Sequence, residues 1–114
     1  MLLSEIVEKL GLTPKTEVDA NAEAADGYCS DLLSDVLNNA KSKYIWVTNQ
    51  KHQNCVAVAS LLELSALIIA GGTEPDDNTI EKAISENVPL YTTKMSAFEV
   101  SGRLYELGIR GENG

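Results

Sequence analysis

The chain has 114 residues, of which 17 are acidic and 9 are basic, so its formal net charge is −8 at pH 7. A chain of this length is predicted to form one domain over residues 1–114. Its negative field repels nucleic-acid phosphates and anionic membrane surfaces alike, so neither nucleic acid nor membrane is expected as a partner.

A short amphipathic helix is predicted at the N-terminus, because apolar residues recur there at helical spacing: Leu3, Ile6, Val7 and Leu10. Gly11 follows, where a left-handed C-cap is most easily formed. Residues 12–26 are rich in small and acidic side chains, and only 17–18 and 23–24 are predicted to be extended.

A second helix is predicted after Gly27-Tyr28-Cys29, with Ser30 and Asp31 as its N-cap residues. Its apolar face is formed by Leu32, Leu33, Val36, Leu37 and Ala40.

Residues 43–72 are predicted to form the centre of an α/β sheet. The segment 43–48 is rich in β-branched and aromatic residues, as a buried strand should be. A polar loop follows, and then an almost wholly apolar helix over 55–64 that Asn54 is expected to cap and that should be covered on two sides. A second apolar strand, 66–70, stops at Gly71-Gly72.

Two more helices and one strand are predicted in the last third of the chain. Pro75 is expected in the first turn of a helix that runs through residue 84, with Asp76 and Asp77 at its positive end. A short strand over 90–92 follows, and Thr93 or Ser96 is expected to cap a last helix that ends near residue 108. This alternation predicts an α/β three-layer sandwich around a small, mainly parallel or mixed sheet, followed by a polar tail over 110–114.

Few residues suggest chemistry. Cys29 and Cys55 form no C-x-x-C pair, so zinc and thioredoxin-like sites are disfavoured and both thiols are expected to be buried. His52 is the only histidine and lacks a second ligand at a suitable spacing. Asp31 and Asp35 share a spacing with acid/base and magnesium sites, but a place in the first turn of a helix would explain Asp31 equally well. No P-loop or nucleophile elbow is present, so neither a cofactor nor an enzymatic activity is expected.

Parallel strands would bring several polar segments to one edge of the sheet, where open α/β sheets bind ligands. The residues concerned are Ser30, Asp31, Asn49, Gln50, His52, Asn54, Gly71, Gly72, Thr93 and Lys94. Hydroxyl and amide donors, two glycines and a lysine are able to hold a phosphate or a carboxylate. In the alternative interpretation, Ser30, Asn54 and Thr93 only cap helices and the glycines only turn the chain.

Four segments, 27–37, 44–48, 66–72 and 92–99, together resemble the DRTGG domain family, and the resemblance covers about residues 18–109. It implies a fold similar to the N-terminal domain of HPr kinase/phosphorylase and to the regulatory insert of CBS-containing pyrophosphatases. It also implies a non-catalytic regulatory or adaptor domain that forms a homodimer, with a redox enzyme such as an iron-only hydrogenase as a partner. Together with the polar residues at the strand ends, it leads us to expect that the domain binds a small anionic metabolite or nucleotide.

The chain departs from the family pattern at two places. Asn49-Gln50-Lys51 stands where the family has its Asp-Arg pair, and Ala70 replaces the threonine before the glycines, so a ligand role of that pair is not carried over.

A purely structural interaction module is the alternative function. Residues 3–10 and 29–37 are the expected partner or dimer surfaces, because a small domain does not bury every apolar face. The N-terminus lacks the basic lead of a secretory signal and no segment is apolar enough to span a bilayer, so a cytoplasmic protein is expected.

Overall fold

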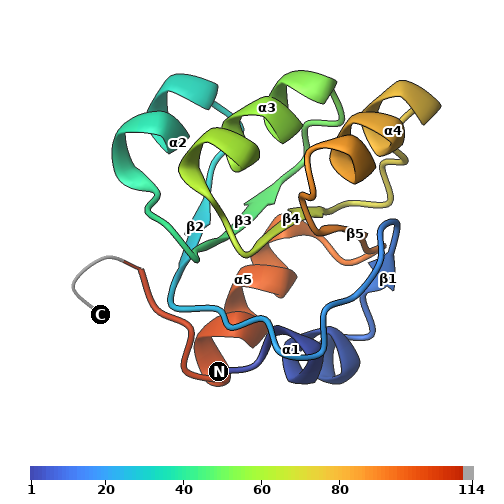
Figure 1. Ribbon diagram of the computed structural model, residues 1–114. Coiled ribbons are helices and arrows are strands. Elements are labelled where there is room, and N and C mark those ends of the chain that lie inside the picture. Colours follow the sequence, from blue (N-terminus) through green and yellow to red (C-terminus); the bar gives the residue numbers. More distant parts are fainter. Residues whose placement is uncertain (112–114) are drawn as a thin grey trace.

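The computed structural model describes residues 1–111, which form five helices and five strands (Figure 1). In chain order these are α1 (Leu3–Leu10), β1 (Thr13–Pro14), β2 (Gly27–Cys29), α2 (Leu33–Asn39), β3 (Ile45–Thr48), α3 (Gln53–Leu62), β4 (Ala66–Ile69), α4 (Asp77–Ser85), β5 (Leu90–Thr92) and α5 (Ala97–Glu106).

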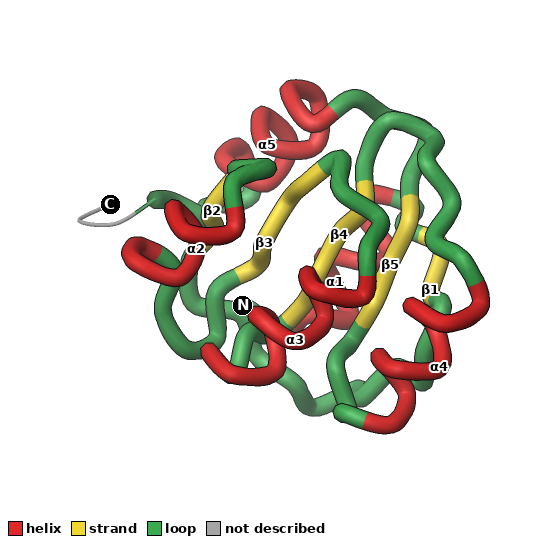
Figure 2. The backbone as a smooth tube through the Cα atoms, turned by 90° about the horizontal axis from the view of Figure 1, so that it is seen from above, coloured by secondary structure: helices red, strands yellow, loops and turns green. Residues whose placement is uncertain are grey.

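The strands form one sheet in the order β1-β5-β4-β3-β2, with β2 and β1 at the two edges (Figure 2). The strands β2, β3, β4 and β5 are parallel, and β1 is antiparallel to β5. Each parallel connection carries a helix, as crossovers between parallel strands require. The predicted α/β class with a mixed, mainly parallel sheet is therefore confirmed.

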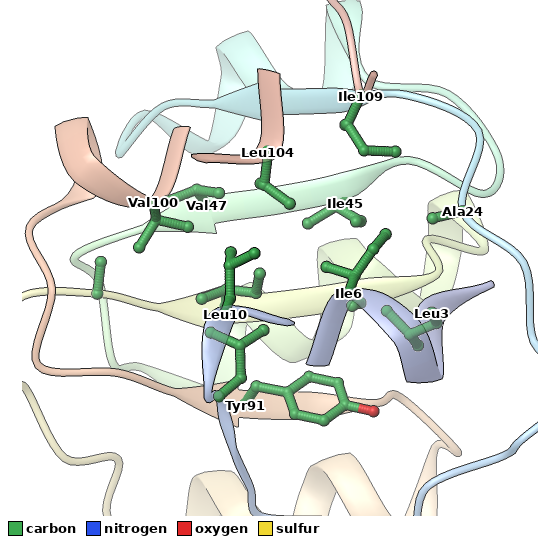
Figure 3. Close-up of a cluster of buried hydrophobic side chains, with 14 residues drawn as sticks. Leu3, Ile6, Leu10, Ala24, Ile45, Val47, Tyr91, Val100, Leu104 and Ile109 are labelled. Atoms are coloured by element: carbon green, nitrogen blue, oxygen red, sulfur yellow. The ribbon is translucent and has the colours of Figure 1, made fainter. Parts of the chain in front are cut away.

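Helices cover both faces of the sheet: α2, α3 and α4 lie on one face, and α1 and α5 lie on the other (Figure 1). Because side chains alternate along a strand, β3 contributes to both layers. Ile45 and Val47 pack toward α1 and α5, while the fully buried Trp46 packs toward α2 and α3. Figure 3 shows the first of these clusters, in which Val100 and Leu104 of α5 point toward the sheet.

The N-terminal segment differs from the prediction. The helix α1 and its left-handed cap at Gly11, with φ +65°, are as predicted. The strand β1 was not predicted because Pro14 disfavours strands, but an edge position tolerates a proline. Residues 17–18 are not a strand, and Glu23 makes only an isolated bridge with Leu2.

Near α2, the predicted helix caps Ser30 and Asp31 and the predicted burial of Cys29 are wrong. The residues 27–29 are the edge strand β2, whose three residues are too few to show periodicity. Leu32 is the N-cap of α2, so Ser30 and Asp31 precede the helix and do not cap it. Cys29 is exposed, because a residue on an edge strand has a covered neighbour on one side only; Cys55 is buried as expected.

Other local predictions require smaller corrections. Pro75 precedes the N-cap Asp76 of α4 rather than occupying its first turn. The face of α3 turned away from the sheet is open, since Leu61 is 74% exposed. The helix α1 buries its apolar residues against the sheet and is not a free partner surface, whereas Leu32 and Leu37 near α2 are exposed. Within residues 1–111, none of the helices has the length and apolarity needed to cross a bilayer. Most of the predicted tail over 110–114 lies outside the described residues.

Candidate functional site at the carboxyl edge of the sheet

Hydrogen bonds join the segments that leave the carboxyl ends of the four parallel strands. The Asp31 carboxylate after β2 accepts from the Thr48 hydroxyl at the end of β3, at 2.7 Å. After β4, the Gly71 amide donates to the Met95 carbonyl at 2.7 Å, and the Gly72 amide donates to the Thr93 carbonyl at 2.9 Å. These polar segments therefore lie side by side along one edge, because parallel strands all end on that side.

Asp31 fixes the loop after β3. The same oxygen, Oδ1, also accepts from the Asn49 amide at 2.8 Å, and the Gln50 side-chain amide donates to the Asp31 carbonyl at 3.3 Å. The Asn49 amide, with the Thr48 hydroxyl, stabilises the charged carboxylate and holds the pKa of Asp31 below its ordinary value. Asp31 thus remains ionised at neutral pH and acts as an acceptor for the protein's own donors.

Ser30 also has partners within the fold. Its hydroxyl accepts from the Leu32 amide at 3.1 Å, and its carbonyl accepts from the Trp46 indole at 2.8 Å. These bonds make Ser30 a turn residue between β2 and α2.

The other end of the same loop is attached to α4. The buried Thr79 hydroxyl donates to the Lys51 carbonyl at 3.0 Å and to the Asp76 carboxylate at 2.8 Å. The Thr79 hydroxyl has a single hydrogen, so it donates to one of these two acceptors or forms one bifurcated hydrogen bond to both. The Thr79 amide, followed by the Thr79 hydroxyl, is the main cause of the lowered pKa of Asp76, and the nearby Lys51 charge lowers it further. The edge therefore holds two carboxylates as well as the Lys51 ammonium.

The two glycines form a turn that few other residues could adopt. Gly71 and Gly72 have φ of +79° and +76°, in the left-handed region that disfavours residues with a Cβ. A Cβ on Gly71 would lie 3.1 Å from Oδ1 of Asn49, so the Asn49 side chain lies against this turn. Thr93 accepts from the Met95 amide through its hydroxyl, and Lys94 is exposed beside it.

The helices that begin at this edge differ in how they are capped. Asp76 caps α4 and Ser96 caps α5 through their side chains. For α3 the N-cap residue is His52, which makes no side-chain cap hydrogen bond, and Asn54 is already inside the helix. The predicted cap Asn54 is therefore wrong, since α3 begins before it. Of the two caps predicted for α5, Ser96 is confirmed, whereas Thr93 uses its hydroxyl in a turn.

The residues considered for metal binding or catalysis are not assembled into one site within residues 1–111. Within residues 1–111, no group of three or more His, Cys, Asp or Glu side chains is placed to hold a metal ion. Burial, followed by the nearby Asp31 charge, raises the pKa of Cys55 to about 11, so its thiol is protonated at neutral pH. In the same part of the chain, no hydrogen bond or ion pair joins His52, Asp31 and Lys94 to one another.

The ten predicted edge residues lie outside three cavities of the molecule. The three described cavities lie between β2 and α5, between residues 16–22 and the α4–β5 region, and between α1 and α5, and none of the ten predicted residues lines them. Sequence reasoning missed Thr48, Asp76 and Thr79 as residues that shape the edge. The Asp76–Thr79 spacing of three residues was a usable signal, since an N-cap bonds the third residue of its helix.

The fold and the edge define an α/β domain with a polar strand-end surface. No protein-family model and no curated protein matches the chain. One similar solved structure is the crystal structure of the CBS and DRTGG domains of the regulatory region of Clostridium perfringens pyrophosphatase, complexed with the activator diadenosine tetraphosphate.

The two structures agree with a TM-score of 0.75 at 18% sequence identity. The match covers 98% of this chain and 51% of the solved chain, so this chain spans about half of the length of that structure. The similarity shows a shared fold, and it is consistent with the resemblance to DRTGG domains predicted from the sequence.

Proposed function

We propose that this protein is a regulatory or adaptor domain without catalytic activity, which binds a small anionic metabolite or nucleotide at the carboxyl edge of its sheet. It acts through a homodimer or a partner enzyme. The observation that carries this proposal is the fold shared with a regulatory region, over nearly the whole of this chain.

The chemistry of the edge supports an anionic ligand. The first turn of α3 has no side-chain cap. The Cys55 amide donates to the His52 carbonyl at 3.0 Å, and the first amides of a helix that lack such a partner are able to bind an anion. Lys51 and His52 are exposed at the start of α3, and Lys94 is exposed in the segment that bonds to the Gly71-Gly72 turn. This turn allows a ligand to approach the backbone closely. Asp31 and Asp76 oppose an anion, but both carboxylates are occupied by bonds within the protein.

Nucleotides are the first ligands to test, because the similar regulatory region was crystallised with diadenosine tetraphosphate. Thermal melting in the presence of diadenosine tetraphosphate, ATP, AMP and inorganic phosphate measures binding to the folded state. A ligand present at 100 times its Kd stabilises the fold by about 2.7 kcal/mol. No shift in melting temperature with any of them at millimolar concentration would refute the ligand-binding part of the proposal.

Exposed apolar side chains favour a second function, a structural interaction module with no small-molecule ligand. Leu32, Leu61, Phe98 and Tyr105 are each more than half exposed, with Phe98 at 88%. Phe98 and Tyr105 belong to one helix, α5, and contiguous exposed apolar side chains are typical of interaction sites. A cytoplasmic location and a redox enzyme as partner stay predictions. Co-purification from a host lysate with no nucleotide response would favour this second function.

A further inference from the structure

The outer face of α5 carries an aromatic stripe, defined here as Phe98, Gly102 and Tyr105. Phe98 is 88% exposed and Tyr105 is 58% exposed. At about 100° per residue the three positions fall within about 60° of one another, on the side opposite Val100 and Leu104, which point toward the sheet (Figure 3). Both aromatic side chains of α5 are therefore exposed on the same face of the helix.

Contacts within a single copy of the chain do not explain why residue 102, in the interior of a helix, is a glycine. Glycine in the interior of a helix is the least favourable residue except proline. Its φ is not in the left-handed region, and a Cβ built on it meets no atom within 4 Å. Alanine would fit and would favour the helix, so neither local conformation nor internal packing requires a glycine. Close approach of another backbone would require it, as at helix contacts built on small residues.

We infer that the aromatic stripe is a homodimer contact, in which α5 of one copy crosses α5 of a second copy in antiparallel orientation at Gly102. Phe98 lies four residues before Gly102 and Tyr105 lies three residues after it. A two-fold axis at the glycine therefore places Phe98 of each copy beside Tyr105 of the other. This spacing makes the stripe complementary to itself, which is the property that a two-fold interface requires.

The surroundings of the stripe suit such a contact between two acidic chains. The Arg110 guanidinium lies 3.9 Å from the centre of the Tyr105 ring, which holds that ring in place before association. The charges of Glu99 and Arg103 beside the stripe are paired within the helix at 2.8 Å. Aromatic pairs that meet edge to face or with offset rings add to the gain from burial.

The area is sufficient for the centre of an interface. The two aromatic side chains expose roughly 300 Å² per copy, and a stable interface needs roughly 800 Å² per partner. The rest would come from the neighbouring edge of β2, where Cys29 is exposed and which borders α5. The opposite sheet edge, β1, contains Pro14, which disfavours pairing with a second sheet.

Sedimentation velocity of the full chain from about 1 µM to 1 mM tests this contact. The wild-type protein is expected to form a dimer, and Phe98→Ala should raise the dimer Kd by at least about 30-fold, as expected for an aromatic anchor. Gly102→Ala should raise the melting temperature measured under monomeric conditions and weaken the dimer by about tenfold or more. Leu61→Ala, on the exposed face of α3, is the matched control and should leave the dimer unchanged.

This inference rests on the dimer of the proposed function and deepens it, but the two fail differently. A dimer that Phe98→Ala and Gly102→Ala leave intact, or that Leu61→Ala weakens equally, would overturn the α5 contact. A wild-type protein that stays monomeric throughout would overturn the contact and the dimer together. In each case the nucleotide melting experiment independently decides the ligand-binding part of the proposed function.

Discussion

Replacing Gly71 with alanine is expected to destabilise the fold by roughly 2 kcal/mol, through two effects that can be separated. The left-handed conformation costs a residue with a Cβ roughly 1–2 kcal/mol. In addition, the new Cβ would lie 3.1 Å from Oδ1 of Asn49, so that side chain must shift slightly from its preferred conformation, at about 0.5–1 kcal/mol. Gly71→Val should lose more, because a β-branched side chain fits this conformation less well.

Gly72 supplies the matched control. Its φ of +76° is close to the +79° of Gly71, but a Cβ at Gly72 meets nothing within 4 Å. Gly72→Ala should therefore show the backbone strain alone. The difference between the two alanine variants measures the Asn49 contact, and Asn49→Ala in the Gly71→Ala background should remove that difference.

Urea unfolding followed by tryptophan fluorescence is a suitable assay, because Trp46 is the only tryptophan and is fully buried. At about 4–8 °C per kcal/mol, the Gly71→Ala loss corresponds to a fall in Tm of roughly 8–16 °C. Equal stability of Gly71→Ala and the wild type would refute the reasoning. A larger loss for Gly72→Ala than for Gly71→Ala would show that Asn49 is not the neighbour that matters.

Four further outcomes are expected. Asp31→Ala should cost about 1–3 kcal/mol in urea titrations, because the buried Thr48 hydroxyl loses its acceptor. The pKa of Asp31 is lowered in the fold, so its stabilisation is complete above the ordinary carboxyl pKa of about 3.9 and is lost as pH falls through the folded value. Asp31→Asn should therefore lose less stability than the wild type in acid titrations followed by circular dichroism. Asp76→Ala should cost about 1 kcal/mol in thermal melts as a lost N-cap, whereas Asp77→Ala should cost much less. Lys94→Ala should weaken anion binding in calorimetry at unchanged Tm, and unchanged affinity would remove Lys94 from the site.

The sequence was most informative where elements are buried on both sides. Residues 45–47 and 66–69 are continuous apolar runs, and both lie in fully buried parallel strands, β3 and β4. Their order along the chain, with helices between, was enough to predict that the strands end at one edge. The edge strands β1 and β2 were missed, because two- and three-residue strands have too little periodicity to detect.

The roles of polar residues depended on contacts between segments distant in the chain. Asp31 looked like a helix cap, but it bonds Thr48, 17 residues away, and Thr79 bonds the Lys51 carbonyl across 28 residues. A carboxylate accepts from whichever donor the fold brings near it, and sequence spacing does not reveal that donor.

The sequence by itself determined the alternation of helices and buried strands, and with it the class of fold, because hydrophobic periodicity is a local property. Only the tertiary structure decided which polar side chains are committed to the fold and which remain available. It also showed that Leu3, Ile6 and Leu10 of α1 are buried while Phe98 and Tyr105 of α5 are exposed, although the two helices lie on the same face of the sheet. Both helices are amphipathic in sequence, and exposure depends on what the folded chain places around each one.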